Sequence, residues 1–270
     1  MWAAPLSRNT ESGHKGPDYT DLPIHKDTRM KVVATGNRKA WLVSRPKPEA
    51  EGNEVVVKLL AAPICGSNMH AFFGEGEHLN DGHEGAGEVV EVDRSSRLEV
   101  GDRVVVQPMT GCGECADCLR GDAIYCADRP EIHGMFAQFT RRPDFLCTPL
   151  PEEIDCLHGS LMGCALGPAS DAIKQLGLKS QDMLVVTGLG PVGLGAVALA
   201  AWKGARVIGV DPVAWRRERA LQLGAEAVFD SAEPDLLTIL REKTAGTGPS
   251  LGIDASGNPE AERLLIDLAT

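Results

Sequence analysis

Two patterns of hydrophobic and polar positions divide the chain. Between about residues 31 and 150, short valine-rich apolar runs alternate with turn residues such as glycine, aspartate and proline. Runs of this length between turn residues are typical of strands that pair in an antiparallel sheet. The pattern therefore predicts a mostly antiparallel, barrel-like domain. Its clearest strands are expected at residues 54–64, 85–92 and 101–108.

After about residue 166 the pattern changes to buried strands that alternate with helices. A helix is expected from Pro191 and another over residues 214–224, each between two apolar runs. Apolar strands separated by helices predict a parallel sheet that is covered on both faces. The expected strands are residues 183–188, 205–211, 225–230 and 251–257.

The chain is therefore expected to be an α/β protein with a β-rich part. Residues 1–30 mix both charge signs with proline, glycine and serine and have no periodicity, which predicts a flexible extension. The β-rich domain is placed at residues 31–165 and the strand–helix domain at residues 166–270.

Composition and charge narrow the classes of partner. The 270 residues are 43% hydrophobic, which is enough for real cores, and the formal net charge of -11 argues against nucleic acid or an anionic membrane as the main partner. No apolar stretch is long enough to span a bilayer, and no secretory signal pattern stands at the N-terminus. We therefore expect a cytoplasmic protein, in whose reducing surroundings clustered thiols bind metal more often than they form disulfides.

A glycine-rich loop follows the expected strand at residues 183–188. Gly188, Gly190 and Gly193 form a G-x-G-x-x-G pattern between a strand and a helix, where backbone N–H groups can hold a pyrophosphate. Asp211 ends the next strand and can accept hydrogen bonds from an adenosine ribose, which favours NAD over NADP. The alternative is an ordinary strand–helix turn with a capping aspartate. The candidate cofactor-binding residues are Gly188, Gly190, Pro191, Val192, Gly193 and Asp211.

Four cysteines crowd into one short segment at about residues 108–128. Cys112, Cys115, Cys118 and Cys126 have the spacing C-x2-C-x2-C-x7-C, which suits a tetrahedral structural zinc ion. Disulfides across such short spacings would be strained, and four unligated surface thiols would be open to oxidation. The segment is therefore expected to be a small lobe that a zinc ion stabilises.

Three further residues form a possible second metal site. Cys65, His83 and Cys164 together are a Cys2His set, the ligand choice of a catalytic zinc that keeps one position open. Taken singly, each is as easily explained as a core thiol or a hydrogen-bonded histidine.

The strings that carry these residues resemble the zinc-dependent alcohol dehydrogenase family of medium-chain dehydrogenases/reductases. They are "ICGSNMH" (64–70), "GHEGAGEVV" (82–90) and "LMGCALGPA" (161–169), followed in family order by the glycine loop. The resemblance covers residues 31–270. It implies a GroES-like barrel domain and a Rossmann domain, with Cys65, His83 and Cys164 as ligands of the catalytic zinc.

The resemblance also implies an activity. It is hydride transfer between an alcohol and NAD, with two zinc ions per chain and a small-molecule alcohol, aldehyde or ketone as substrate. Ser67 and His70 resemble the family's proton relay, and Glu84 resembles the acid beside the zinc ligands. Asn68 stands where the family usually has aspartate, so weaker tuning of the metal is expected.

The end of the sequence leaves alternatives open. Residues 259–270 are expected to form a helix, whereas family members continue with further Rossmann strands and the usual subunit interface. The Rossmann domain is therefore expected to be incomplete, and a homo-oligomer is expected if that interface is present. The alternative is a truncated, inactive protein that still binds NAD and zinc. A quinone or enoyl reductase of the same fold is disfavoured, because such enzymes lack the metal ligands.

Overall fold

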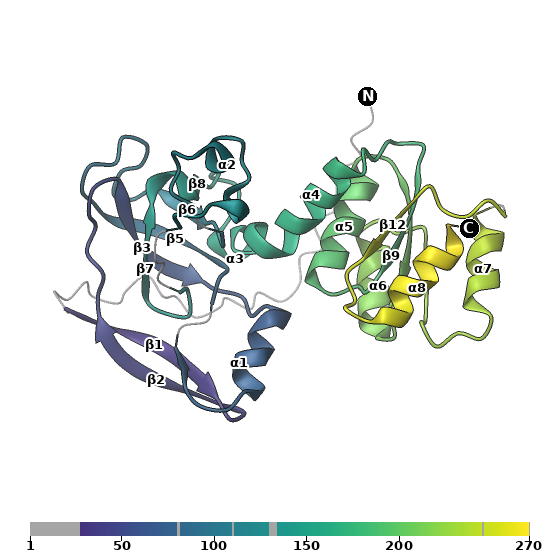
Figure 1. Cartoon of the computed structure of the whole chain (residues 1–270), viewed down its shortest axis with the longest axis horizontal. Helices are drawn as coiled ribbons and strands as arrows, with labels where there is room; N and C mark the ends of the chain where they lie inside the picture. Colours follow the sequence, from purple (N-terminus) through teal and green to yellow (C-terminus); the bar gives the residue numbers. More distant parts are fainter. Residues whose placement is uncertain (1–27, 80–81, 110, 130–133, 245, 270) are drawn as a thin grey trace, which may run out of the picture.

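The computed structural model describes residues 28–79, 82–109, 111–129, 134–244 and 246–269. Two lobes lie side by side along the longest axis of the molecule (Figure 1). The N-terminal lobe is built mainly from strands, and the C-terminal lobe alternates strands with helices. The extension expected at residues 1–30 lies almost wholly outside the described residues, and the expected domain boundaries stay predictions.

The N-terminal lobe contains two antiparallel sheets. The larger has the order β7-β3-β5-β6-β8 and the smaller the order β2-β1-β4, and a bridge between Val32 and Ala137 joins them. The expectation of an antiparallel, barrel-like domain is thus confirmed. The strands are β1 (Arg29–Gly36), β2 (Lys39–Pro46), β3 (Glu54–Ala61), β4 (His78–Leu79), β5 (Gly85–Val92), β6 (Arg103–Val106), β7 (Phe139–Pro143) and β8 (Cys147–Pro149).

Strand alternation places the core of this lobe. Val55 and Val57 of β3 point to the same face and pack with Val89 of the neighbouring β5 and with Val104 and Val106 of β6, the strand beyond it. All five are fully buried. Val56 and Val105 alternate with them and are buried on the opposite face of the sheet. The short helical segments that carry functional residues surround this core; they are η1 (Gly66–Asn68), α1 (Met69–Phe73), α2 (Ala116–Leu119), η2 (Ala123–Tyr125) and η3 (Asp144–Leu146).

The C-terminal lobe contains a parallel sheet with the strand order β11-β10-β9-β12. In chain order this is third, second, first, fourth, the beginning of the order typical of dinucleotide-binding sheets. The direction of winding reverses between β9 and β12, where such sheets bind their ligand. The strands are β9 (Met183–Thr187), β10 (Arg206–Val210), β11 (Ala227–Phe229) and β12 (Leu251–Asp254).

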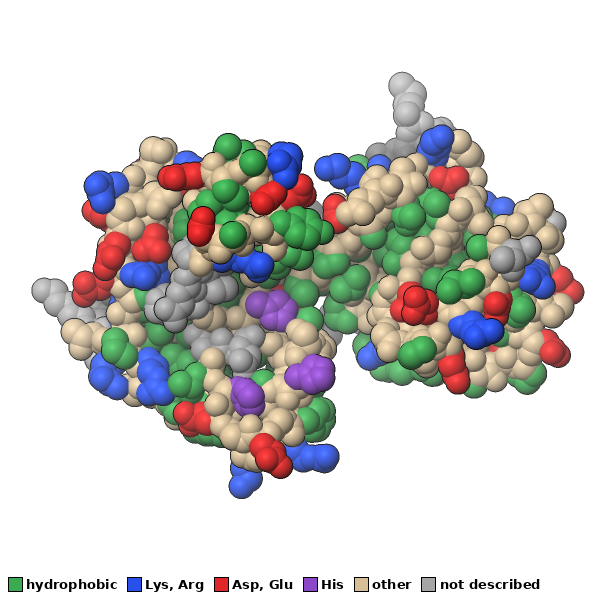
Figure 2. All heavy atoms as spheres, in the orientation of Figure 1, with side chains coloured by type: hydrophobic (Ala, Val, Ile, Leu, Met, Phe, Trp, Pro, Cys, Tyr) green, Lys and Arg blue, Asp and Glu red, His purple; other side chains and the backbone are tan. Residues whose placement is uncertain are grey.

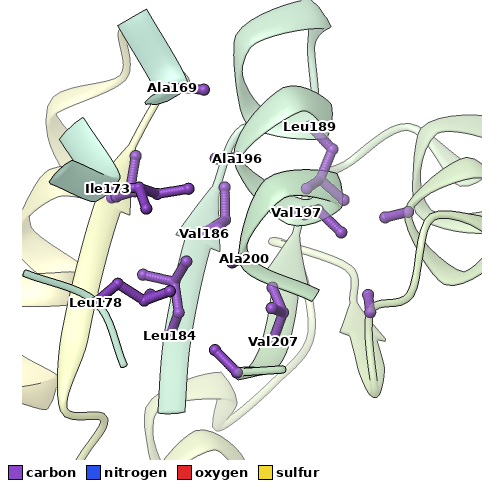
Figure 3. Close-up of a cluster of buried hydrophobic side chains, with 14 residues drawn as sticks. Ala169, Ile173, Leu178, Leu184, Val186, Leu189, Ala196, Val197, Ala200 and Val207 are labelled. Atoms are coloured by element: carbon purple, nitrogen blue, oxygen red, sulfur yellow. The ribbon is translucent and has the colours of Figure 1, made fainter. Parts of the chain in front are cut away.

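Helices cover both faces of this sheet, as the sequence pattern predicts. Leu184 and Val186 of β9 belong to a core with α4 and α5 on one face (Figure 3). Met183 and Val185 alternate with them and pack against α7 and α8 on the other face. The helices are α4 (Gly167–Gln175), α5 (Pro191–Trp202), α6 (Ala214–Gln222), α7 (Leu236–Lys243) and α8 (Pro259–Leu268).

The two lobes are joined by a chain segment of short helical elements. It runs from α3 (Cys156–Gly159) through a single π-helical segment, η4 (Met162–Leu166), into α4. Of the helices in the described part of the chain, none combines the length and the apolarity needed to cross a bilayer.

Candidate functional site

Cys65 lies in the turn that follows β3. It is the N-cap residue of η1, and its backbone N–H donates a hydrogen bond of 2.8 Å to the side-chain oxygen of Asn68. Asn68 is buried, and this hydrogen bond fixes the position of the Cys65 backbone. Asn68, which stands where the family usually has aspartate, therefore helps to position Cys65. The weaker tuning of a metal that was expected from Asn68 stays a prediction.

His83 and Glu84 precede β5. His83 is half-buried, whereas Glu84 is only 4% exposed. The two side chains approach each other, with 3.9 Å between Nε2 of His83 and Oε1 of Glu84. Burial raises the pKa of the Glu84 carboxyl, against the lowering effect of His83.

Cys164 lies at the centre of the π-helical segment between the lobes. A π turn is wider than an α turn and is frequent at functional sites, because it redirects the side chain that it carries. Close packing holds this turn on both sides. A Cβ on Gly163 would lie 3.0 Å from Pro108 of the N-terminal lobe, and one on Gly195 of α5 would lie 2.8 Å from the carbonyl oxygen of Ala165.

These three segments bring four potential metal ligands together. The Sγ atoms of Cys65 and Cys164 are 3.7 Å apart, close to the edge of about 3.8 Å in a tetrahedron with Zn–S bonds of about 2.3 Å. Ligand atoms of Cys65, His83, Glu84 and Cys164 all lie within 4.8 Å of one another. The sequence prediction assigned Glu84 a place beside the ligands, and the structure puts its carboxylate among them. In the sequence, the one indication that Glu84 could be a ligand is its position directly after His83.

The electrostatics of the cluster suit a bound cation. Burial, and after it the neighbouring Glu84 carboxylate, raises the pKa of the Cys164 thiol to about 12. Crowded buried acids disfavour one another's ionised forms, and a divalent cation reverses that effect. The donor set therefore fits zinc in both geometry and charge.

A second cluster occupies the small lobe formed by α2 and η2. Ligand atoms of Cys112, Cys115, Cys118 and Cys126 lie within 4.8 Å of one another. The Sγ atoms of Cys112 and Cys118 are 4.0 Å apart, about twice the length of an S–S bond. All four cysteines are free thiols in this structure. The geometry thus suits a tetrahedral ion rather than a pair of disulfides.

Backbone N–H groups stabilise the thiolate form of this second cluster. The N–H of Cys115 donates to the sulfur of Cys112 at 3.3 Å, and that of Cys112 donates to the sulfur of Cys126 at 3.3 Å. Hydrogen bonds from the backbone of Glu114 and then of Cys115 lower the pKa of the Cys112 thiol to about 7. Thiolates are the form that binds zinc, so Cys112 is prepared for an ion. At Cys118 a backbone hydrogen bond from Gly113 lowers the pKa, but burial and the neighbouring cysteines outweigh it and raise the pKa to about 12, an effect that a bound cation would reverse.

The glycine loop lies between β9 and α5, at the reversal of the sheet. Gly188 has a φ of 81°, and a Cβ on Gly193 would lie 1.8 Å from the Gly188 carbonyl oxygen. These two positions therefore require glycine for the turn and for close packing. A Cβ on Gly190 would meet nothing within 4 Å. The open space above Gly190, before the N-terminal turn of α5 that begins with Pro191 and Val192, fits an approaching pyrophosphate.

Asp211 lines the same cavity, whose volume is about 460 Å³. Its side chain is buried and accepts hydrogen bonds from the N–H groups of Leu189 and Val213, at 2.7 and 2.8 Å. Arg216 approaches the carboxylate at 3.5 Å. Asp211 therefore ties the glycine loop to the start of α6, as a capping aspartate would, and also faces the space that a ribose would occupy.

Ser67 and His70 lie on a different hollow, beside the first metal cluster. Both side chains are exposed and line this hollow together with His83. Histidine side chains gather on the face of the N-terminal lobe that is turned toward the C-terminal lobe (Figure 2). The two expected relay residues are thus close to the metal cluster and accessible to solvent.

A parallel sheet with this strand order, joined to an antiparallel barrel and accompanied by two clusters of metal-ligating side chains, defines the class of metal-binding, dinucleotide-dependent dehydrogenases. Comparison with known proteins agrees. Residues 51–152 match the family model of the alcohol dehydrogenase GroES-like domain, and residues 191–270 match that of zinc-binding dehydrogenases. The chain belongs to the zinc-dependent alcohol dehydrogenase family of medium-chain dehydrogenases/reductases.

Individual relatives are consistent with this family. The chain is 30% identical to an L-threonine 3-dehydrogenase of Shewanella oneidensis over 240 residues, 84% of this chain and 70% of that protein. An alcohol dehydrogenase of Thermus sp. ATN1 superposes with a TM-score of 0.81 at 26% identity, covering 88% of this chain and 74% of the other. An alcohol dehydrogenase of Escherichia coli CFT073, solved with NADH, gives a TM-score of 0.79 at 26% identity over 90% and 74% of the two chains.

These comparisons confirm several sequence predictions. The family, the fold class of GroES-like barrel plus Rossmann sheet, and the class of zinc-dependent, NAD-linked oxidoreductase are as expected. Nothing in them favours the inactive alternative. The number of zinc ions and the role of each site residue remain predictions.

Proposed function

We propose that this chain oxidises a small alcohol reversibly with NAD, at a zinc site formed by Cys65, His83 and Cys164. The observation that carries the proposal is the 3.7 Å separation of the two sulfur atoms, with a histidine nitrogen in the same cluster. The names of the relatives, L-threonine 3-dehydrogenase and alcohol dehydrogenase, support an alcohol as the class of substrate.

The residues of the chain have distinct parts in this chemistry. A zinc ion at the site would supply Lewis acidity to the substrate oxygen. Cys65, His83 and Cys164 would hold the ion, and Glu84 would offer a carboxylate oxygen as a fourth ligand atom. Ser67 and His70, which line the hollow beside the cluster, pass the hydroxyl proton toward solvent.

The Rossmann lobe holds the hydride acceptor. The backbone of Gly188, Gly190 and Gly193, with Pro191 and Val192 in the first turn of α5, receives the pyrophosphate of NAD. Asp211 accepts hydrogen bonds from the adenosine ribose, in the cavity that it lines with Gly190. Its carboxylate also repels a 2′-phosphate, which favours NAD over NADP.

The cysteine lobe would hold a second zinc ion with a structural role. Four thiols within 4.8 Å of one another leave no open ligand position, which is typical of structural sites. The proposal is therefore two zinc ions per chain. The expected homo-oligomer and the cytoplasmic location stay predictions.

Zinc analysis and an alcohol panel test the proposal together. The purified chain is expected to contain two zinc ions and to reduce NAD with at least one small alcohol, followed by NADH absorbance. Cys65→Ala is expected to lose one zinc ion and all turnover, whereas Cys156→Ala, which removes a buried thiol outside both clusters, keeps both. Turnover that persists in Cys65→Ala would refute the ligand assignment. Two zinc ions with no turnover on any alcohol would favour the non-catalytic binding protein instead.

A further inference from the structure

The cavity beside the glycine loop extends across the end of β9. Asp211 follows β10 and Asp254 ends β12, and these two strands lie on opposite sides of β9 in the sheet. Asp211 lines the cavity on the β10 side, and Ser256 and Asn258 line it on the β12 side. The β12–α8 segment (residues 255–258) therefore forms a second wall of the cavity.

This β12–α8 segment packs directly against the glycine loop. A Cβ on Gly188 would lie 2.5 Å from both the Cα and the backbone N of Ser256. The N–H of Ala255 donates a hydrogen bond of 2.8 Å to the carbonyl oxygen of Thr187, the residue before Gly188. Since Gly188 also lines the cavity, any shift of Ser256 changes the space beside the first glycine of the loop.

A single carboxylate oxygen, Oδ1 of Asp254, holds this contact together. It accepts hydrogen bonds from Thr187 Oγ1 at 2.7 Å, from Ser256 Oγ at 2.7 Å and from the Ser256 N–H at 3.2 Å. The Ser256 hydroxyl oxygen in turn accepts a hydrogen bond of 2.9 Å from the N–H of Asn258, the N-cap residue of α8. One group thus connects the end of β9, the β12–α8 segment and the start of α8.

Asp254 acts at one remove from the cavity. It does not belong to the described lining, whereas its partners Thr187 and Ser256 do. Hydrogen bonds to an ionised acceptor are roughly twice as strong as those between neutral groups. A wall that is fixed before the ligand arrives also binds it without the free-energy cost of ordering a loop. Loss of this carboxylate is therefore expected to weaken binding in the cavity although the glycine loop keeps its own residues.

We propose that Asp254 is a positioning residue for the dinucleotide, which fixes the β12–α8 segment at the distance from the glycine loop that the cofactor requires. This inference rests on the proposed function, because it takes NAD to bind in the cavity lined by Gly190 and Asp211. It adds a residue outside the glycine pattern whose effect falls on the cofactor and not on the metal cluster or the alcohol.

NADH fluorescence titration and initial rates on the zinc-loaded chain test this inference. Asp254→Ala is expected to bind NADH about tenfold more weakly and to raise KM for NAD by a similar factor. In the same variant kcat at saturating NAD does not fall, and KM for the alcohol stays within about twofold of wild type. Asp254→Asn, whose amide oxygen can still accept the hydrogen bonds, is expected to stay within about threefold of wild type in NADH affinity.

A double-mutant cycle tests the hydrogen bond itself. Thr187→Val removes only the donor hydroxyl, so it is expected to weaken NADH binding in the wild-type chain and to have no further effect in Asp254→Ala. Effects of the two substitutions that simply add would overturn the inference. Thr187→Val also keeps the test decisive where Asp254→Ala does not fold, because unchanged NADH affinity in Thr187→Val would overturn the inference by itself.

Asp182→Ala is the control for general destabilisation of the lobe. Asp182 directly precedes β9 at the end away from the cavity, and its Oδ2 accepts a hydrogen bond of 2.7 Å from the N–H of Lys179. It lies outside the described cavity lining. This variant is expected to lower the melting temperature and to leave NADH affinity unchanged. Equal loss of NADH affinity in Asp182→Ala and Asp254→Ala would overturn the inference, because any loosening of the lobe would then have the same effect.

Gly190→Val, whose side chain would fill the space above the glycine loop, distinguishes failure of this inference from failure of the proposed function. If Gly190→Val weakens NADH binding and Asp254→Ala does not, the proposed cofactor site stands and the inference is wrong. If neither variant weakens it, or if the wild-type chain binds no NADH, the proposed cofactor site is wrong and the inference fails with it.

Discussion

The Sγ atoms of Cys65 and Cys164 lie 3.7 Å apart, although 99 positions separate the two residues in the sequence. Cys65 follows a strand of the barrel, and Cys164 lies in the π-helical segment that leads to the Rossmann lobe. A single site therefore depends on how the connecting segment packs against the barrel.

Glu84→Gln is expected to weaken zinc binding at the first cluster by about 10-fold to 100-fold, the usual effect of altering a group that supports the ligands. The reason is that the substitution removes a buried negative charge from among the ligand atoms. Zinc affinity can be measured by competition with a chelator. The control is Glu88→Gln, on the strand β5 that Glu84 precedes and outside the cluster. Equal affinity in the two variants would contradict a role for the carboxylate in holding the ion.

Cys115→Ala is expected to remove one zinc ion and to lower the melting temperature by about 5 °C or more. The small lobe contains only short helical turns, and among its four cysteines only Cys126 is buried, so it has little core of its own. Elemental analysis and differential scanning calorimetry give the two measurements. Zinc content that falls without any change in the melting temperature would show that the ion does not stabilise the fold.

Gly190→Val is expected to fold normally and to bind NADH at least about tenfold more weakly. A Cβ at this position meets no atom within 4 Å, and the backbone of Gly190 has φ −71° and ψ −171°, which valine adopts readily. The added side chain would fill the space intended for the pyrophosphate. NADH fluorescence titration gives the affinity, and an unchanged melting temperature is the control for folding. Undiminished NADH binding would place the cofactor elsewhere.

Asp254→Asn is expected to lower the melting temperature by about 2–4 °C at neutral pH, equivalent to about 1 kcal/mol. Oδ1 of Asp254 accepts hydrogen bonds from Thr187 Oγ1 and from Ser256, which join β9 to the segment after β12. Burial raises the pKa of this carboxyl, but the hydrogen bonds outweigh it and leave the pKa below its ordinary value of 3.8.

The pH dependence of this effect has a definite sign. Because the folded state lowers the pKa, the stabilisation is complete above pH 3.8 and is lost as the pH falls through the folded-state value. The difference between wild type and Asp254→Asn should therefore shrink in thermal melts at about pH 3. A difference that grows on acidification would contradict the assignment.

Much of the fold follows from local sequence patterns. Buried runs such as residues 183–188 predict parallel strands, because a strand covered on both faces needs apolar side chains at every position. The glycine pattern is similarly local, since the turn at Gly188 and the close contact at Gly193 involve residues a few positions apart. Element ends were less certain: the strand expected at residues 54–64 ends at Ala61, before the turn that leads to Cys65.

The candidate site was only partly predictable. Cys65, His83 and Cys164 were identified by residue type and resemblance. The distances between their side chains could not be derived from their spacing in the sequence. The resemblance placed Glu84 beside the ligands but did not indicate that its carboxylate would lie among the ligand atoms, and nothing in the sequence indicated that Cys164 would lie on a π turn. The hydrogen bonds that the β1–β2 hairpin donates to the carbonyl oxygens of Phe72 and Gly74 could likewise not be predicted, because they join backbone groups.

By itself, the sequence determined the two architectures, the four-cysteine lobe and the glycine loop, because each is set by side-chain periodicity or by spacings of a few residues. Only the tertiary structure decided which distant side chains meet, such as the two cysteine sulfur atoms that lie 3.7 Å apart. Those distances depend on how whole sheets and connecting segments pack, and packing is a property of the complete set of contacts rather than of any one stretch of chain.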